Sequence, residues 1–258
     1  MYVKVKLVIH TIVKSKEVKE VGGSSPPPYA NDMKFLFCYK PNPIVKAYYS
    51  DKLGEDYDPN KVVELYQKCL ESFKKYYQVK VIDNFDNEFL YQNDFKLNIL
   101  KKYPDYIITD PDIILDKPLK IPEGFDVYVD FNYLNYTDGM EVMEQSIQEF
   151  KDAGFNLYEN FFNGKYVTNL GFLYIPNEDL RRKYIYLYDH LKKWLKINNV
   201  KFNPEHTMIL GQVSLGFLIE KFNFKVCFLR EYNEKRYRHY AGINKHRKSF
   251  KIPNQSLL

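Results

Sequence analysis

The hydrophobic positions of the chain follow helical spacing in some segments and run together, as in buried strands, in others. Between residues 59 and 77 five nonpolar residues share one side of a predicted helix, namely Val62, Tyr66, Cys69, Phe73 and Tyr76. A second helix is predicted from Asn87 to Lys102, with Phe89, Asn93, Leu97 and Leu100 on one side. The segments MKFLFCYK, QVKVID and DYIITDPDIIL lie before, between and after these helices and are typical of strands. This alternation predicts right-handed βαβ units and a mainly parallel sheet.

The second half of the chain is less regular. FDVYVDFNYLNY, YVTNLGFLYI and KVCFLREY are predicted strands. An amphipathic helix is predicted from Glu178 to Lys196, with Leu180, Tyr184, Leu187, Leu191 and Trp194 on one face. The next helix, His206 to Phe222, is apolar nearly all round and should be buried. We therefore predict an α/β fold, a single Rossmann-like domain with a mainly parallel central sheet flanked by helices.

The first 32 residues differ from the rest. Tyr2 to Val13 has the pattern of a strand, and GGSSPPPYAND after it has the composition of a loop or linker. We predict an N-terminal strand and linker over residues 1–32, and a main domain over residues 33–258 that ends in the basic segment 235–258. The sequence leaves open whether the first part is an extra strand pair or an outer appendage. With 258 residues and 45% hydrophobic content, the chain can build a sizeable core.

Charge and cysteine content narrow the function classes. The net charge of +5 is modest and does not by itself indicate nucleic-acid binding. The three cysteines have no metal-ligand spacing, which favours free, buried thiols in a reducing compartment. The first residues, MYVKVKLVIHTIVK, interleave lysines with apolar residues, unlike a signal peptide, and no apolar run reaches membrane-spanning length. We predict a soluble, cytoplasmic protein that does not insert into membranes.

Two aspartates interrupt the apolar segment YIITDPDIIL. Asp110 and Asp112 follow four strand-like residues, and in open α/β sheets ligands gather beyond the carboxyl ends of the strands. Residues two apart in a strand point to the same side, so the two carboxylates would repel unless a cation lay between them. Hard oxygen ligands suit Mg²⁺ or Mn²⁺. The alternative is a strand-ending turn, since Asp-Pro-Asp is good turn chemistry.

The surrounding segment, NDFKLNILKKYPDYIITDPDIILDKPL, resembles the region around the Asp-x-Asp motif of GT-A-fold glycosyltransferases. The resemblance implies a GT-A fold in which Asp110 and Asp112 hold Mn²⁺ or Mg²⁺ against the diphosphate of a nucleotide-sugar. Lys96 would be a contact to this donor. Tyr39 and Lys40, at the end of the first strand of the domain, could meet the base or ribose by position.

A second segment, HYAGINK, is similar to the His-x-x-Gly-x-x-Lys pattern of glycogenin-like retaining glycosyltransferases. The resemblance implies that His239 completes the metal site and that Gly242 and Lys245 hold the diphosphate. This chain continues with His246-Arg247, where the family usually has Pro-Trp. The alternative is a solvated basic tail, because residues 235 to 251 contain seven Lys and Arg and no acid.

Two further segments match the family in order. YVTNLGFLYI resembles its Asn-x-Gly strand through Asn169 and Gly171, which implies a place beside the sugar and acceptor. A tight backbone contact at Gly171 is the structural alternative. NPEHTMIL stands where relatives carry an Asp-Gln pair. There Glu205 could contact the sugar or act as a base, or it could cap the following helix.

Together the motifs imply a metal-dependent glycosyltransferase that moves a sugar from a nucleotide-diphosphate donor, UDP-sugar being favoured, to an acceptor hydroxyl with retention. The acceptor could be a glycan, a protein or a nucleobase. Inversion would need a base, and Asp130, Asp138 or Glu205 could serve. Two alternatives stay open. One is a viral or phage-type enzyme that glycosylates modified DNA bases, with the basic tail on phosphates. The other is an inactive relative that binds nucleotide-sugars.

Overall fold

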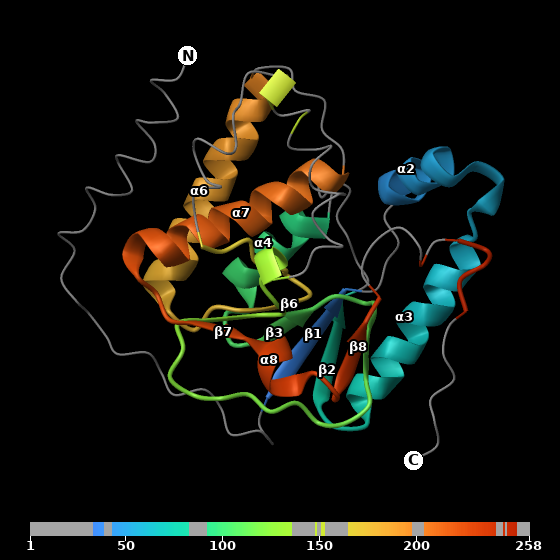
Figure 1. The fold of residues 1–258 in the computed structure, drawn as a ribbon, viewed down its shortest axis with the longest axis horizontal. Helices are drawn as coiled ribbons and strands as arrows, with labels where there is room; N and C mark the ends of the chain where they lie inside the picture. Colours follow the sequence, from blue (N-terminus) through green and yellow to red (C-terminus); the bar gives the residue numbers. More distant parts are fainter. Residues whose placement is uncertain are drawn as a thin grey trace.

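A six-stranded sheet runs through the molecule, with helices against both of its faces (Figure 1). The structure is a computed structural model. It describes residues 33–38, 43–82, 92–135, 148, 151–152, 165–197, 204–240, 245 and 247–251. The predicted strand Tyr2 to Val13 and its linker lie outside the described residues. The division of the chain at residue 32 therefore stays a prediction.

The helices and strands of the first half are β1 (Lys34–Cys38), α2 (Pro43–Leu53), the 3-10 helix η2 (Gly54–Asp56), α3 (Pro59–Lys74), β2 (Gln78–Ile82), α4 (Gln92–Lys102), β3 (Ile107–Thr109), β4 (Ile113–Leu115), β5 (Val127–Val129) and the 3-10 helix η3 (Tyr133–Asn135). Those of the second half are β6 (Phe172–Tyr174), α6 (Glu178–Ile197), α7 (Pro204–Phe222), β7 (Val226–Phe228), α8 (Leu229–Asn233) and β8 (Tyr237–His239).

The central sheet has the strand order β2-β1-β3-β6-β5-β7. β1 pairs in parallel with β2 and β3, and β5 pairs in parallel with β7. Only β6 runs against its neighbours β3 and β5. The predicted α/β class, with a mostly parallel central sheet flanked by helices, is confirmed. One consequence matters for function: β6 begins at the edge where β3 and β5 end.

Each face of the sheet has its own hydrophobic core. α4, α6 and α7 lie on one face of the sheet (Figure 1). Their side chains pack with strand residues such as Leu36, Ile108 and Leu173. On the other face, α3 and a separate two-stranded ribbon of β4 and β8 cover Phe35, Tyr128 and neighbouring residues. β3, β5 and β6 are therefore buried on both sides, which explains their continuous apolar runs, whereas the edge strand β2 is partly exposed.

The start of α3 and the burial of α7 agree with what the sequence predicts. α3 begins after Asp58, whose carboxylate accepts the backbone N–H of Asn60 at 2.9 Å, with Pro59 at the first position. α7 is buried from Ile209 to Leu215, as its apolar composition predicts. Cys69 and Cys227 are buried free thiols, also as predicted. Among the helices that the structure describes, none combines the length and hydrophobicity of a membrane span.

The strands depart from prediction in four places. FDVYVDFNYLNY holds the short strand β5 and then the 3-10 helix η3 rather than one strand. The strand predicted across YIITDPDIIL is two strands, β3 and β4, because Pro111 lacks an N–H for a sheet and sits in a turn. KVCFLREY holds β7 and the short helix α8 rather than one strand. The segment after Lys235, predicted to be irregular, contains β8. β8 is antiparallel to β4, with Ile113 opposite His239.

Candidate metal centre

Asp110 and Asp112 lie in the turn between β3 and β4, at the carboxyl end of β3. The predicted strand alternation between them is therefore wrong, and the turn alternative describes their backbone. Two hydrogen bonds fix this turn. The N–H of Asp110 donates to the carbonyl of Gly171 at 2.7 Å, and the N–H of Tyr240 donates to the carbonyl of Asp112 at 2.9 Å. A rigid turn can present both carboxylates to one point as well as a strand can.

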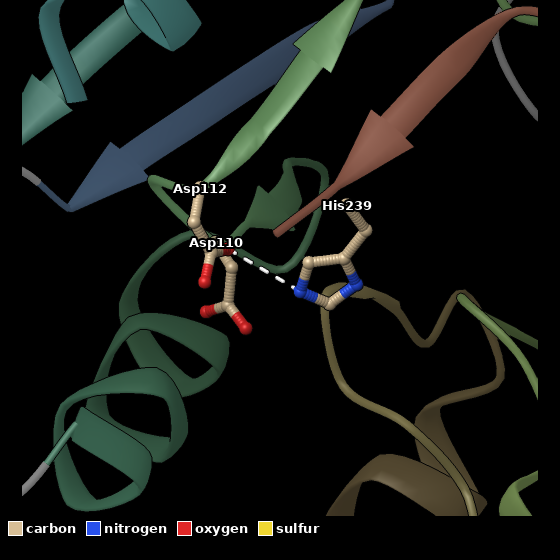
Figure 2. A group of neighbouring side chains, drawn as sticks. All are labelled: Asp110, Asp112 and His239. Carbon is tan, nitrogen blue, oxygen red and sulfur yellow. Dashed lines mark ion pairs between the residues drawn. The ribbon is translucent and has the colours of Figure 1, made fainter. Parts of the chain in front are cut away.

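The ribbon of β4 and β8 brings the histidine to this turn. Because Ile113 is opposite His239 in the antiparallel register, the histidine lies next to the residue that follows Asp112. Figure 2 shows the imidazole facing both carboxylates. Sequence spacing alone gives no reason for these residues to meet, since a large part of the domain separates them.

The three side chains form a compact group of potential ligands. His239 Nε2 lies 3.3 Å from Asp112 Oδ1 (Figure 2), and one ligand atom from each residue fits within 4.8 Å of the others. Ligand atoms that share an ion at about 2.1 Å are themselves about 3 Å apart. The side chains of His239 and Asp112 are 2% and 4% exposed, and that of Asp110 is 17% exposed. Asp110, Asp112 and His239 could therefore hold a metal ion, as the motifs imply.

An unpaired oxygen supports this fit. Apart from its contact with His239, Asp112 Oδ1 is buried with no hydrogen-bond partner among the described residues. A buried carboxylate oxygen is costly to leave without a partner. When the imidazole is neutral with its proton on Nδ1, the lone pair of Nε2 faces this oxygen. The contact then needs a cation between the two atoms, which is a second ring proton in the metal-free protein or a metal ion in its place.

Lysines neutralise the carboxylates from outside the ligand group. Lys245 forms an ion pair with Asp112 Oδ2. Lys96 is buried, and its Nζ lies 2.7 Å from Asp110 Oδ1 and 2.6 Å from the Leu170 carbonyl. Predicted as a contact to the donor, Lys96 is here the counter-charge of Asp110. Lys245 is in the same way the counter-charge of Asp112.

Burial and these neighbours shift the ionisation of the group. Burial opposes ionisation of Asp112, but Lys245 and His239 outweigh it and hold the pKa of Asp112 well below its usual range. Burial raises the pKa of Asp110, although Lys96 opposes the rise. Burial favours neutral His239, but Asp112 and Asp130 outweigh it and raise its pKa to about 9. The two carboxylates therefore differ: the pKa of Asp112 is lowered, whereas that of Asp110 is raised.

Gly171 explains the Asn-x-Gly motif. A Cβ at this position would lie 2.6 Å from Cε1 of His239 and 2.9 Å from Oδ2 of Asp130. The tight contact considered for Gly171 is therefore a contact with the histidine ring. Asn169 fixes the backbone at Gly171. Its Oδ1 accepts the N–H of Gly171 at 2.8 Å, and its Nδ2 donates to the hydroxyl of Tyr133 at 2.7 Å. The place of Asn169 beside the sugar and acceptor stays a prediction.

Several predicted site residues lie beyond what the structure describes. Tyr39, Lys40, Gly242 and Asp138 are outside the described residues. Glu205 is in the first turn of α7, but its side chain is not described.

Sequence reasoning missed how Asp130 is used. It was considered only as a candidate base, yet its Oδ2 lies 2.5 Å from Nδ1 of His239. The signal was its position directly after a buried strand, like that of Asp110.

Comparisons with known proteins give no family for this chain. No protein-family model matches it, and no curated protein and no solved structure is similar enough to count as a match.

Proposed function

We propose that the protein is a metal-dependent GT-A-type glycosyltransferase that uses a nucleotide-diphosphate sugar as donor. The observation that supports this most is the meeting of two motifs from distant parts of the chain. Asp110 and Asp112 come from the turn after β3, and His239 comes from β8, yet their ligand atoms gather within 4.8 Å. A chance Asp-x-Asp and an unrelated basic tail would have no reason to converge.

The charges of the described residues suit a diphosphate. Asp110 and Asp112 carry counter-charges from Lys96 and Lys245, so a divalent ion would leave the site positive overall. A ligand with at least two negative charges would restore the balance. Lys245 is 14% exposed at its side chain, whereas Lys96 is only 4% exposed. Lys245 is therefore the ammonium group that can turn from Asp112 to a phosphate oxygen.

The chemistry follows from breaking a bond between a sugar carbon and a diphosphate. A bound divalent ion would act as a Lewis acid toward the negative charge on the leaving diphosphate. Asp110, Asp112 and His239 would hold that ion, and Lys245 would add a positive charge at the phosphates. Mn²⁺ or Mg²⁺ suits two carboxylates and one imidazole. UDP as nucleotide, the sugar and retention of configuration are taken from the family resemblance.

The proposed function is tested by comparing donor hydrolysis in the wild type and in the Asp112→Asn variant. The carboxamide keeps the shape of Asp112 but removes the charge that binds the ion and Lys245, so metal-dependent release of UDP from UDP-sugars should fall at least 100-fold. Asp116→Asn is the matched control. Asp116 is an aspartate at the other end of β4, outside the ligand group. Its Oδ1 lies 2.7 Å from Nη2 of Arg238.

The two variants separate the outcomes. The Asp116 variant should keep full activity, and both variants should keep the circular dichroism spectrum of the wild type. Activity of Asp112→Asn within a few-fold of the wild type would reject the proposal and leave Asp-Pro-Asp as a structural turn.

A further inference from the structure

Asp130 lies directly after β5, fully buried, on the side of His239 that faces away from Asp112. We infer that Asp130 is a positioning residue, which holds the imidazole of His239 with Nδ1 protonated and Nε2 directed at Asp110 and Asp112. The inference rests on the metal centre of the proposed function. It assigns a role to a residue that touches none of the reacting atoms.

The hydrogen bonds determine the tautomer. Nδ1 of His239 lies 2.5 Å from Oδ2 of Asp130. An ionised carboxylate only accepts hydrogen bonds, so Nδ1 must be the donor. In the neutral ring the lone pair is then on Nε2, the atom that lies 3.3 Å from Asp112. Ligand histidines commonly donate their second N–H to a carboxylate in this way.

Asp130 is itself held in place. Its Oδ1 accepts a hydrogen bond from the hydroxyl of Tyr237, and Nη2 of Arg230 lies 3.4 Å from its Oδ2. Tyr237 and His239 are two apart on β8, so their side chains leave the strand on the same side and reach one carboxylate together. The strand therefore delivers the ligand and the group that anchors its partner.

The space around the ring allows little rotation. Gly171 touches one side, where a Cβ would lie 2.6 Å from Cε1. The ring of Phe131 lies nearby, with its centroid 6.4 Å from that of the imidazole at an interplanar angle of 64°. Packing thus supports the orientation that the hydrogen bond selects.

The same contacts make Asp130 unsuitable as a general base. Both of its oxygens accept from His239, Tyr237 or Arg230, and the side chain is 0% exposed. A general base must reach the proton that it removes. Of the residues considered as a base for inversion, Asp130 is therefore assigned to the histidine.

Asp130→Asn tests the inference through Mn²⁺ binding without any nucleotide. The amide keeps the size of the carboxylate but loses the charge that selects the Nδ1–H tautomer. We expect Mn²⁺ affinity to fall about 10- to 100-fold, the usual effect of losing such a partner. Pulsed electron paramagnetic resonance should detect a coordinated imidazole nitrogen on Mn²⁺ in the wild type, a weaker signal in Asp130→Asn and none in His239→Ala.

Asp126→Asn is the matched control, because Asp126 is a carboxylate at the opposite end of the same strand. It accepts from the side chain of Asn177 and from the N–H of Lys225, both at 2.8 Å. This variant should lose stability but keep the Mn²⁺ affinity and the imidazole signal. If Asp130→Asn does not fold, Tyr237→Phe tests the same inference, and we expect a several-fold loss of Mn²⁺ affinity because Asp130 loses its anchor.

The outcomes are distinguishable. A wild type that fails to bind Mn²⁺ would overturn the metal centre and the proposed function together. A wild type with a coordinated imidazole, and a folded Asp130→Asn or Tyr237→Phe with unchanged affinity and signal, would overturn only the role of Asp130.

Discussion

The absence of a side chain at residue 171 is required by the ring of His239. Gly171→Ala would place a methyl group 2.6 Å from Cε1 of the ring and 2.9 Å from Asp130. We expect a loss of about 1–3 kcal/mol in unfolding free energy, as for other small-to-large changes in packed sites. Because the ring must move, Mn²⁺ affinity should also fall. Chemical denaturation and Mn²⁺ titration measure the two effects.

Gly124→Ala separates backbone strain from the site. Gly124 has φ of +85° with open space around it, so alanine there strains the backbone without touching the histidine. Its unfolding free energy should fall while its Mn²⁺ affinity stays that of the wild type. Equal Mn²⁺ affinity in Gly171→Ala and the wild type would show that the ring does not need this space.

The buried thiols should be inert at ordinary pH. Burial raises the pKa of Cys227 to about 12, and it also raises the pKa of Cys69. At pH 8 only about one Cys227 in 10,000 would then be a thiolate, and the thiolate is the reactive form. Iodoacetamide at pH 8, read by peptide mapping, should leave both unmodified in the native protein and label both in guanidinium chloride. Rapid native labelling of Cys227 would contradict its burial.

At this scale the candidate metal ligands could be identified from the sequence better than the residues that contact them. Asp110, Asp112 and His239 belong to motifs with fixed spacing, so they could be named in advance. Asp130 and Tyr237 act through contacts across the fold, and their spacing carries no sign of this. Lys96 was named, but nothing in its spacing shows that its ammonium would be buried against Asp110.

At the scale of elements, the segment after β8 is tied to the end of η2 and to Tyr57, just before α3. Arg247 pairs with Asp56 at 2.6 Å, and the N–H of Lys248 donates to the carbonyl of Asp56 at 2.7 Å. Tyr57 and Arg247 form an isolated antiparallel bridge. These contacts hold the chain two residues beyond Lys245, and they therefore limit where its ammonium can reach.

Arg247→Ala should affect nucleotide binding more than stability. Both partners of the Arg247 pair are partly exposed, and such pairs contribute about 0–1 kcal/mol. Loss of the tether gives Lys245 more freedom, so we expect UDP affinity in Mn²⁺ to fall several-fold by calorimetry. Arg182→Ala, which breaks an exposed pair with Glu178 on α6, should leave UDP affinity unchanged. Equal UDP affinity in both variants would show that the pair of Arg247 and Asp56 does not affect nucleotide binding.

The elements themselves were predicted unevenly, for physical reasons. α3, α6 and α7 have long helical periodicity, and their predicted ends agree with the structure within a few residues. β4 and β8 have three residues each and pair across most of the domain. A strand this short has no measurable periodicity, and only the folded chain specifies its partner.

At the scale of the whole molecule, the site lies where an α/β sheet is expected to bind ligands. Asp110 follows β3, Asp130 follows β5, and Gly171 precedes the antiparallel β6, so all three meet at one edge of the sheet. The general rule on carboxyl ends of strands predicted this edge from the order of elements alone. It could not predict that one reversed strand would contribute as well.

Thermal denaturation tests the site in the whole protein. UDP with Mn²⁺ should stabilise the fold by mass action, about 2.7 kcal/mol at a hundredfold excess over Kd. UDP in EDTA should give little stabilisation, because Lys96 and Lys245 are then paired with Asp110 and Asp112 and the site offers the phosphates no net positive charge. Equal stabilisation in EDTA and in Mn²⁺ would contradict a metal-bridged diphosphate.

The ribbon of β4 and β8 would affect how long an ion stays bound as well as where it binds. A ribbon of two three-residue strands is marginal on its own and depends on its packing against the central sheet, so this one should open more readily than the sheet itself. His239 is the last residue of β8, and each opening would take one ligand away from the other two. An ion bound by all three would in turn keep the ribbon shut. The residence time of the ion and the closed lifetime of the ribbon would then rise and fall together.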